Sequence, residues 1–106
     1  MDKKTDDIIK QYVAQVAKKY PGLVASYLFG SYAKNTETPD SDIDVAFILE
    51  NLADSAQFDL EIQLMTLRRK FDLRIEPHAL SKEEFMSWSP FAHEIRKYGI
   101  EIPIGG

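Results

Sequence analysis

Apolar and polar residues follow one another along this chain with two different periods, and the changes of period divide it into helices and strands. From about Thr5 to Tyr20 the apolar residues lie three and four positions apart, which predicts an amphipathic helix that Pro21-Gly22 ends. Leu23–Phe29 is an apolar run that predicts a first strand. Two more strands are predicted over Asp42–Leu49 and Phe71–Leu80, the latter with clear alternation of apolar and polar residues.

The remaining segments predict three more helices and a short edge strand or tail. The helices run from Asp54 to about Lys70, from Ser81 to about Trp88, and from Ser89-Pro90 to Gly99, and Ile100–Ile104 follows them. The first has two adjoining apolar stripes, namely Phe58, Ile62 and Met65, and Leu60, Leu64 and Leu67. In the last two we expect five residues to cover the sheet, although Trp88 could partly serve a partner surface: Phe85, Met86, Trp88, Phe91 and Ile95.

The second predicted strand is apolar on both faces except where it carries two carboxylates, Asp42 and Asp44. Such a strand belongs in the centre of a sheet whose faces are covered. Pro77 places the third strand near an edge, because proline cannot donate to a neighbouring strand. The order of elements predicts an α/β fold: a small mixed β-sheet covered by helices, mainly on one side.

Composition narrows the class of protein. A length of 106 residues fits one domain, 1–106. The chain has no cysteine, which excludes a disulfide framework and a Cys-based zinc site. It has no apolar run of membrane-spanning length and no signal sequence, so we expect a cytoplasmic protein without a membrane partner. The net charge of −4 makes nucleic acid an improbable partner, because non-specific binding needs a basic surface.

Two short motifs carry the candidate chemistry. In the first, Gly30 allows close approach to the backbone, and Ser31 is a good N-cap for a helix through Lys34, where free N–H groups suit a phosphate. In the second, Asp42 and Asp44 are two residues apart and therefore lie on one face of a strand. Burying both carboxylates without a cation would be costly, and Mg²⁺ is the usual cation among oxygen ligands and phosphates.

Together, Gly30-Ser31-Tyr32-Ala33 and Ser41-Asp42-Ile43-Asp44 resemble the motif of the polymerase β nucleotidyltransferase superfamily, most closely its minimal branch of small free-standing domains. That branch often has glycine where this chain has Asn35, a residue that tolerates left-handed geometry. The superfamily places a third carboxylate within a hydrophobic-acidic-hydrophobic triplet after a short basic run. Phe71-Asp72-Leu73 matches that pattern well and Ile75-Glu76-Pro77 more loosely, so Asp72 is favoured over Glu76.

The resemblance implies a polymerase β-like nucleotidyltransferase fold and a Mg²⁺-dependent enzyme. It would transfer a nucleoside monophosphate, with ATP as the expected donor, to a hydroxyl and release pyrophosphate. Asp42, Asp44 and Asp72 would be the catalytic and metal-binding residues, with Gly30 and Ser31 on the β- and γ-phosphates. His78 could touch the substrate or be purely structural.

Some members of the minimal branch are antitoxins paired with a small helical toxin of the HEPN type. The expected partner is therefore such a toxin, with a tyrosine hydroxyl as acceptor. The alternative is a non-catalytic antitoxin that neutralises the toxin by masking it. Beyond the nucleotide site, no residues suggest a pocket for a small-molecule acceptor.

Overall fold

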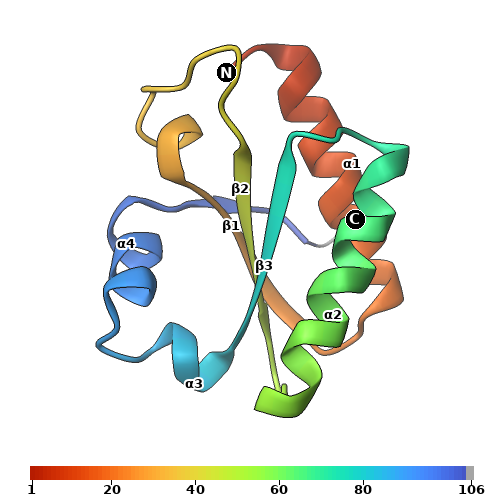
Figure 1. Ribbon diagram of the computed structural model, residues 1–106, viewed down its shortest axis with the longest axis vertical. Coiled ribbons are helices and arrows are strands. Elements are labelled where there is room, and N and C mark those ends of the chain that lie inside the picture. Colours follow the sequence, from red (N-terminus) through yellow and green to blue (C-terminus); the bar gives the residue numbers. More distant parts are fainter. Residues whose placement is uncertain (105–106) are drawn as a thin grey trace.

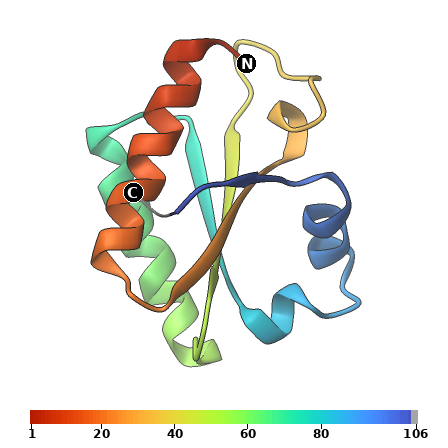
Figure 2. The ribbon, with the colours of Figure 1, turned by 180° about the vertical axis from the view of Figure 1, so that it is seen from behind.

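A four-stranded mixed sheet separates two unequal layers of helices in the computed structural model, which describes residues 1–104 (Figures 1 and 2). The elements are α1 (Lys3–Lys19), β1 (Leu23–Phe29), η1 (Gly30–Tyr32), β2 (Ile43–Leu49), α2 (Asp54–Leu67), η2 (Arg68–Lys70), β3 (Ile75–Ser81), α3 (Lys82–Phe85), α4 (Pro90–Tyr98) and β4 (Ile100–Ile102). The strand order is β3-β2-β1-β4, with β1 antiparallel to β2 and β4, and β2 parallel to β3. The predicted α/β fold with a small mixed sheet is confirmed.

The main core lies between the sheet and the pair α1 and α2. Tyr12 of α1 is fully buried there, its hydroxyl donating to the backbone oxygen of Leu64 at 2.8 Å. Its ring meets Phe47 and Phe71 edge-on, with centroids 5.7 and 5.5 Å away. One side chain therefore joins α1, α2 and the central strand.

The opposite face of the sheet has a smaller core under α3 and α4. Its buried residues are Phe29, Ala46, Ile48, Leu80 and Ile95. α3 and α4 follow β3 and cover only part of this face, whereas α1 and α2 run along the other side (Figures 1 and 2). Asp44, near the start of β2, stays half-buried on the less covered face.

Several sequence predictions are confirmed. β1 has the predicted bounds, β2 is central, and β3, which contains Pro77, is an edge strand. The two helices predicted to start at Ser81 and at Ser89 are each capped by that serine, since Ser81 Oγ accepts from the Glu84 N–H at 3.0 Å and Ser89 Oγ accepts from the Ala92 N–H at 3.1 Å. None of the helices in residues 1–104 combines the length and apolar character needed to cross a bilayer.

Other predicted boundaries were wrong. α1 begins at Lys3, because Asp2 rather than Thr5 is the N-cap and accepts from the Thr5 N–H at 2.7 Å. β3 begins only at Ile75, because the preceding residues form a turn. Met86 and Trp88 do not cover the sheet, since they are 66% and 95% exposed.

The buried hydroxyl of Tyr12 offers a test of the main core. We expect Tyr12→Phe to lower the free energy of unfolding by about 1 kcal/mol, the usual value of one buried hydrogen bond. Tyr12→Ala should lower it by about 3–5 kcal/mol because it also leaves a cavity. Urea unfolding measures both changes, with the exposed Tyr98→Phe as control. A Tyr12→Phe protein as stable as wild type would show that the bond to Leu64 adds nothing.

Candidate active site

The Gly30 turn lies directly against Asp44. Phe29, the last residue of β1, pairs with Asp44 of β2, and Gly30 follows with a φ of 73°. A Cβ atom added to Gly30 would lie 2.4 Å from Asp44 Oδ2, which is closer than any real contact allows. Glycine is therefore required here both for its backbone conformation and for the space that it leaves beside the carboxylate.

The turn is tighter than the sequence suggested. Gly30–Tyr32 is one turn of 3-10 helix, and Ser31 lies inside it instead of capping an α-helix. The Gly30 oxygen accepts from the N–H groups of Ala33 and Lys34, each at 3.2 Å. Asn35 has a φ of 57°, so this residue does adopt the left-handed backbone geometry that asparagine was expected to tolerate here.

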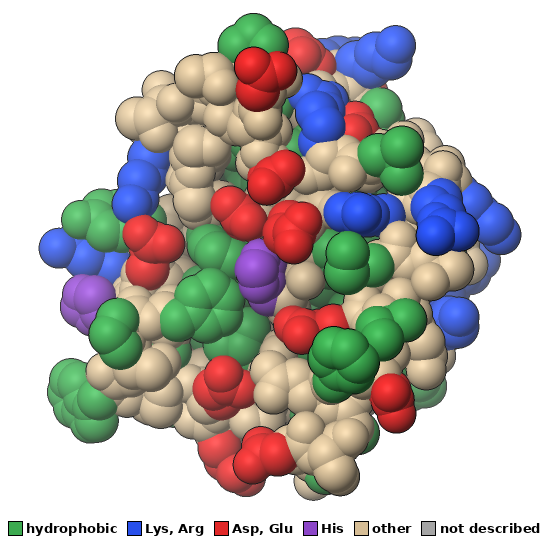
Figure 3. All heavy atoms as spheres, in the orientation of Figure 1, with side chains coloured by type: hydrophobic (Ala, Val, Ile, Leu, Met, Phe, Trp, Pro, Cys, Tyr) green, Lys and Arg blue, Asp and Glu red, His purple; other side chains and the backbone are tan. Residues whose placement is uncertain are grey.

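Carboxylates from two strands face the same side of the sheet at this end. Asp42 is exposed just before β2, and Asp44 is half-buried within it. In the parallel pairing of β2 and β3, Glu76 lies directly opposite Asp44. Figure 3 shows acidic side chains gathered beside a histidine near the middle of this face. The structure thus brings Asp44 and Glu76 together in register, with Asp42 two residues before Asp44.

Asp72 lies apart from this register, in the turn before β3. Both its oxygens are engaged by Arg74: Oδ2 accepts from Nη2 at 2.8 Å, and Oδ1 accepts from Nε at 3.1 Å and from the backbone N–H at 2.9 Å. Hydrogen bonding from the Arg74 guanidinium lowers the pKa of Asp72, although partial burial acts in the opposite direction. The predicted strand would have placed Asp72 beside Asp42 and Asp44, and the turn removes that reason for choosing it.

Arg74 also extends toward the α1 side of the molecule. Its Nη1 donates to the Tyr32 hydroxyl at 3.1 Å, and its Nη2 donates to Thr5 Oγ1 at 3.4 Å. Arg74 therefore ties the turn before β3 to the Gly30 turn and to the start of α1.

His78, which the sequence left without a definite role, is next to the carboxylates. Its Nε2 is 3.3 Å from Asp44 Oδ1. Its ring meets Phe29 and Phe91 at centroid distances of 5.2 and 5.5 Å. The available sequence signal was its spacing, because a residue two after Glu76 on the same strand must share its face.

Asp42, Asp44 and Glu76 offer a set of oxygen donors that suits Mg²⁺. Carboxylate oxygens are the ligands that this ion prefers, and Gly30 lets the backbone of its turn lie directly against Asp44 Oδ2. Among residues 1–104, no three Asp, Glu, His or Cys side chains form a ready-made metal site. Protein Mg²⁺ sites commonly use one or two carboxylates and complete the shell with water and substrate phosphates. The donor set fits such a shared site.

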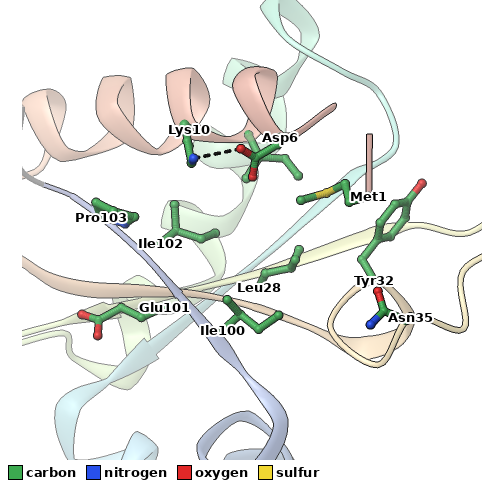
Figure 4. A pocket seen from close by; sticks show the side chains of 11 residues that line it. Met1, Asp6, Lys10, Leu28, Tyr32, Asn35, Ile100, Glu101, Ile102 and Pro103 are labelled. Atoms are coloured by element: carbon green, nitrogen blue, oxygen red, sulfur yellow. Dashed lines mark ion pairs between the residues drawn. The ribbon is translucent and has the colours of Figure 1, made fainter. Parts of the chain in front are cut away.

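A cavity of about 400 Å³ lies elsewhere, between α1, β4 and the back of the Gly30 turn. Figure 4 shows Leu28 and Ile102 within it and the ion pair of Asp6 with Lys10, 2.8 Å long, at its α1 side. The expectation that the chain has no room for a small-molecule pocket was therefore wrong. The cavity is on the α1 side of the sheet, whereas Asp44 faces the other.

Solved structures with similar folds include a candidate nucleotidyltransferase from Sulfolobus solfataricus, with 21% identity and a TM-score of 0.67 over 95% of this chain and 87% of that one. A toxin-antitoxin complex with AMP-PNP has 22% identity and a TM-score of 0.61, over 91% and 73% of the two chains. A complex of tri-AMPylated Shewanella oneidensis HEPN toxin with MNT antitoxin has 20% identity and a TM-score of 0.53, again over 91% and 73%. At these identities the likeness is one of fold.

Comparison with curated proteins found no match. The family model described as "Polymerase beta, Nucleotidyltransferase" matches residues 11–102, which is most of the chain. The matched span includes the Gly30 turn, the carboxylates of β2 and the whole sheet. This protein therefore belongs to the polymerase beta nucleotidyltransferase family.

Proposed function

We propose that this chain, as a single domain over residues 1–106, transfers AMP from ATP to a hydroxyl of a partner protein and releases pyrophosphate. The observation that carries the proposal is the contact between the Gly30 turn and Asp44, with Glu76 opposite Asp44 in the sheet. A backbone turn that can approach a phosphate, beside two carboxylates at one edge of the sheet, suits a metal-bound triphosphate. The similar folds that include a HEPN toxin complex support a HEPN-type toxin as the partner.

Each residue of the candidate site would contact a different part of the bound nucleotide. Gly30 and Ser31 would contact the β- and γ-phosphates, because their turn leaves backbone close to the carboxylates without an intervening side chain. Asp42 and Asp44 would hold the Mg²⁺ that arrives with the nucleotide. Bound there, Mg²⁺ would neutralise phosphate charge and make the α-phosphorus easier to attack. His78 would keep Asp44 oriented through their contact.

For the third carboxylate we favour Glu76 over Asp72. Glu76 is supported by its register opposite Asp44, and its side chain is 40% exposed. Its Oε2 lies 3.7 Å from Arg68 Nη1, which donates its hydrogen bond to the Ile75 oxygen instead, so this pair is looser than that of Asp72. Asp72 is already paired with Arg74 through both oxygens and is 15% exposed. Releasing Asp72 would break a charged pair with three hydrogen bonds, so Asp72 is better suited to a structural role.

In the proposed reaction, the acceptor oxygen forms a bond to the α-phosphorus of ATP. The bond from that phosphorus to the oxygen bridging to the β-phosphate breaks, and pyrophosphate leaves with the electron pair. The acceptor proton passes to the Glu76 carboxylate and then to water. The chain contributes mainly by positioning the reactants and by placing its charges before the reaction starts.

The metal role of Asp44 can be tested without an activity assay. Mg²⁺ or Mn²⁺ with ATP should raise the melting temperature of the wild-type protein, because a ligand at a hundred times its Kd stabilises the folded state by about 2.7 kcal/mol. Asp44→Asn should melt no lower than wild type without metal and should lose this response, as should Asp42→Asn. The control is Asp59→Asn, which removes an exposed carboxylate of α2. A large loss of metal-free stability in both site variants would make these aspartates structural.

Asp72 and Glu76 should respond differently to removal of their charge. Glu76→Gln should abolish AMP transfer and lower the free energy of unfolding by less than about 1 kcal/mol, because it removes only a partly exposed ion pair with Arg68. Asp72→Asn should retain much of the transfer and lower the free energy of unfolding at pH 7 by about 1–2 kcal/mol, after allowance for the partial exposure of Arg74.

The stabilisation that Asp72 provides through Arg74 should depend on pH. Because Arg74 lowers the pKa of folded Asp72, its contribution is present above the unfolded pKa of about 3.9 and is lost as the pH falls through the folded value. The stability difference between Asp72→Asn and wild type should therefore shrink below about pH 4. Urea unfolding from pH 2 to 7 measures it. Loss of transfer in Asp72→Asn alone, at unchanged stability, would restore Asp72 as the third carboxylate.

The reaction itself can be followed with two labelled samples of ATP, incubated with Mg²⁺ and the product of the neighbouring reading frame, where we expect the HEPN-type toxin to be encoded. Label at the α-phosphate should move onto the partner, and label at the γ-phosphate should leave as pyrophosphate. Asp44→Asn is the matched negative control. Transfer of the γ-label would identify a kinase instead. A tight complex without transfer from any of the four nucleoside triphosphates would favour an antitoxin that acts by masking.

A further inference from the structure

The connection between α3 and α4 exposes three large apolar side chains, which we call the α3–α4 corner. Trp88 is 95% exposed, Met86 is 66% exposed and Phe91 is 37% exposed. Single exposed apolar residues are common, but tryptophan with two large neighbours within six residues is typical of a binding surface. The sequence predicted that all three cover the sheet, with Trp88 partly available to a partner surface. Phe91 contacts Phe29 of the smaller core, whereas Met86 and Trp88 are mostly exposed.

Trp88 is exposed on an ordered turn. The two serines beside it are bonded to each other, with their Oγ atoms 3.2 Å apart, and the Ser89 N–H also donates to Ser87 Oγ at 3.3 Å. Ser89 Oγ then caps α4 by accepting from the Ala92 N–H. Arg96 of α4 donates a hydrogen bond to the Phe85 backbone oxygen and so ties the end of α3 to α4. A tryptophan held in this way loses little backbone freedom when it is bound.

The corner is continuous with the candidate active site. Phe91 lies 5.4 Å from Phe29 and 5.5 Å from His78, measured between ring centroids. His78 in turn contacts Asp44. A second link joins α4 to the Gly30 turn, since Lys34 Nζ pairs with Glu94 at 2.8 Å. A protein seated on Trp88 would therefore reach the rim of the carboxylate face.

The charges around the corner favour one kind of occupant. Of the basic residues nearby, Lys82 pairs with Glu50 at 3.5 Å and Arg96 donates to the Phe85 oxygen, which leaves Lys97 exposed on α4. Toward the site the charge is acidic, from the exposed Glu83 and the carboxylates of β2 and β3, and a second copy that presented the same groups there would be repelled. RNA, DNA and an anionic membrane would meet the same repulsion. A protein with basic residues around an apolar pocket would meet complementary charge and could take the indole of Trp88 into that pocket.

We propose that the α3–α4 corner is the docking surface for the acceptor protein, which inserts an apolar pocket edged by Lys or Arg over Trp88. This inference rests on the proposed function for the existence of an acceptor protein, but the surface itself is tested by binding and needs no catalysis. The acceptor hydroxyl would then approach the carboxylates from the α4 side, past Phe91 and His78.

The test uses the full chain, without nucleotide, and the product of the neighbouring reading frame as the probe, the same protein that serves as acceptor in the labelling experiment. Trp88→Ser should raise the Kd for the probe at least ten-fold and leave the melting temperature and the response to Mg²⁺ and ATP unchanged. The matched control is Phe58→Ser, which removes another aromatic ring, 70% exposed, from α2. Its Kd should equal that of wild type.

A second readout comes from fluorescence, because Trp88 is the single tryptophan of the chain. Binding of the probe should shift its emission to the blue and protect it from acrylamide quenching. The same titration with Trp88→Phe records the emission of the probe's own tryptophans alone, which is then subtracted. An unshifted and equally quenched Trp88 in the complex would contradict docking at the corner.

The outcomes separate the surface from the enzyme. If Trp88→Ser weakens binding but the wild-type chain transfers no AMP, the docking surface is supported and the proposed reaction is refuted. If the wild-type chain transfers AMP and Trp88→Ser binds the probe with the wild-type Kd, only the docking surface is refuted. A loss of affinity in Phe58→Ser instead of Trp88→Ser would move the interface to α2. Absence of binding by the wild-type chain, or a homodimer that Trp88→Ser dissociates, would also overturn the proposal.

Discussion

The register of the central strand is the constraint on which the site depends. β2 pairs with β1 so that Asp44 is opposite Phe29, and with β3 so that Asp44 is opposite Glu76. A slip of one residue would turn Asp44 into the main core and bring Ile43 or Val45 to the open face. The apolar residues that alternate with the carboxylates exclude such a slip, because Ile43, Val45 and Phe47 are completely buried. Packing on one face thus positions the chemistry on the other.

The same register explains why Gly30 is irreplaceable. The turn begins directly after the residue paired with Asp44, so its backbone must pass beside the carboxylate. Any side chain at Gly30 would occupy the space next to Asp44 Oδ2 and would also strain a backbone with positive φ. Arg74 stabilises the turn from behind through the Tyr32 hydroxyl. The turn is therefore held between β2 and the segment that precedes β3.

The two helical layers have different tasks. α1 and α2 bury most of the core through contacts such as that of Tyr12 with Leu64, and they supply most of the stability. α3 and α4 shield only part of the other face, which leaves the carboxylates accessible and exposes Trp88 at their edge. Incomplete coverage of this face costs buried apolar area, and it is what allows a nucleotide and a partner protein to reach the carboxylates in the proposed function.

The sequence determined more of the fold than of the site. Local periodicity located β1, the central position of β2, the edge position of β3 and the serine caps, because burial and capping are decided by near neighbours. It also located the Gly30 turn and the Asp42 and Asp44 pair, since both motifs are contiguous in the chain.

Only the tertiary structure decided between alternatives of equal local quality. Of the two apolar stripes of α2, the one with Leu60 and Leu64 is buried and the one with Phe58 is exposed. The pattern Phe71-Asp72-Leu73 looked like a strand, but Arg74 draws Asp72 into a turn, and Glu76 takes the place opposite Asp44. Which stripe is buried and which carboxylate lies opposite Asp44 both depend on contacts with residues distant in sequence. Local propensities do not include the free energy of such contacts.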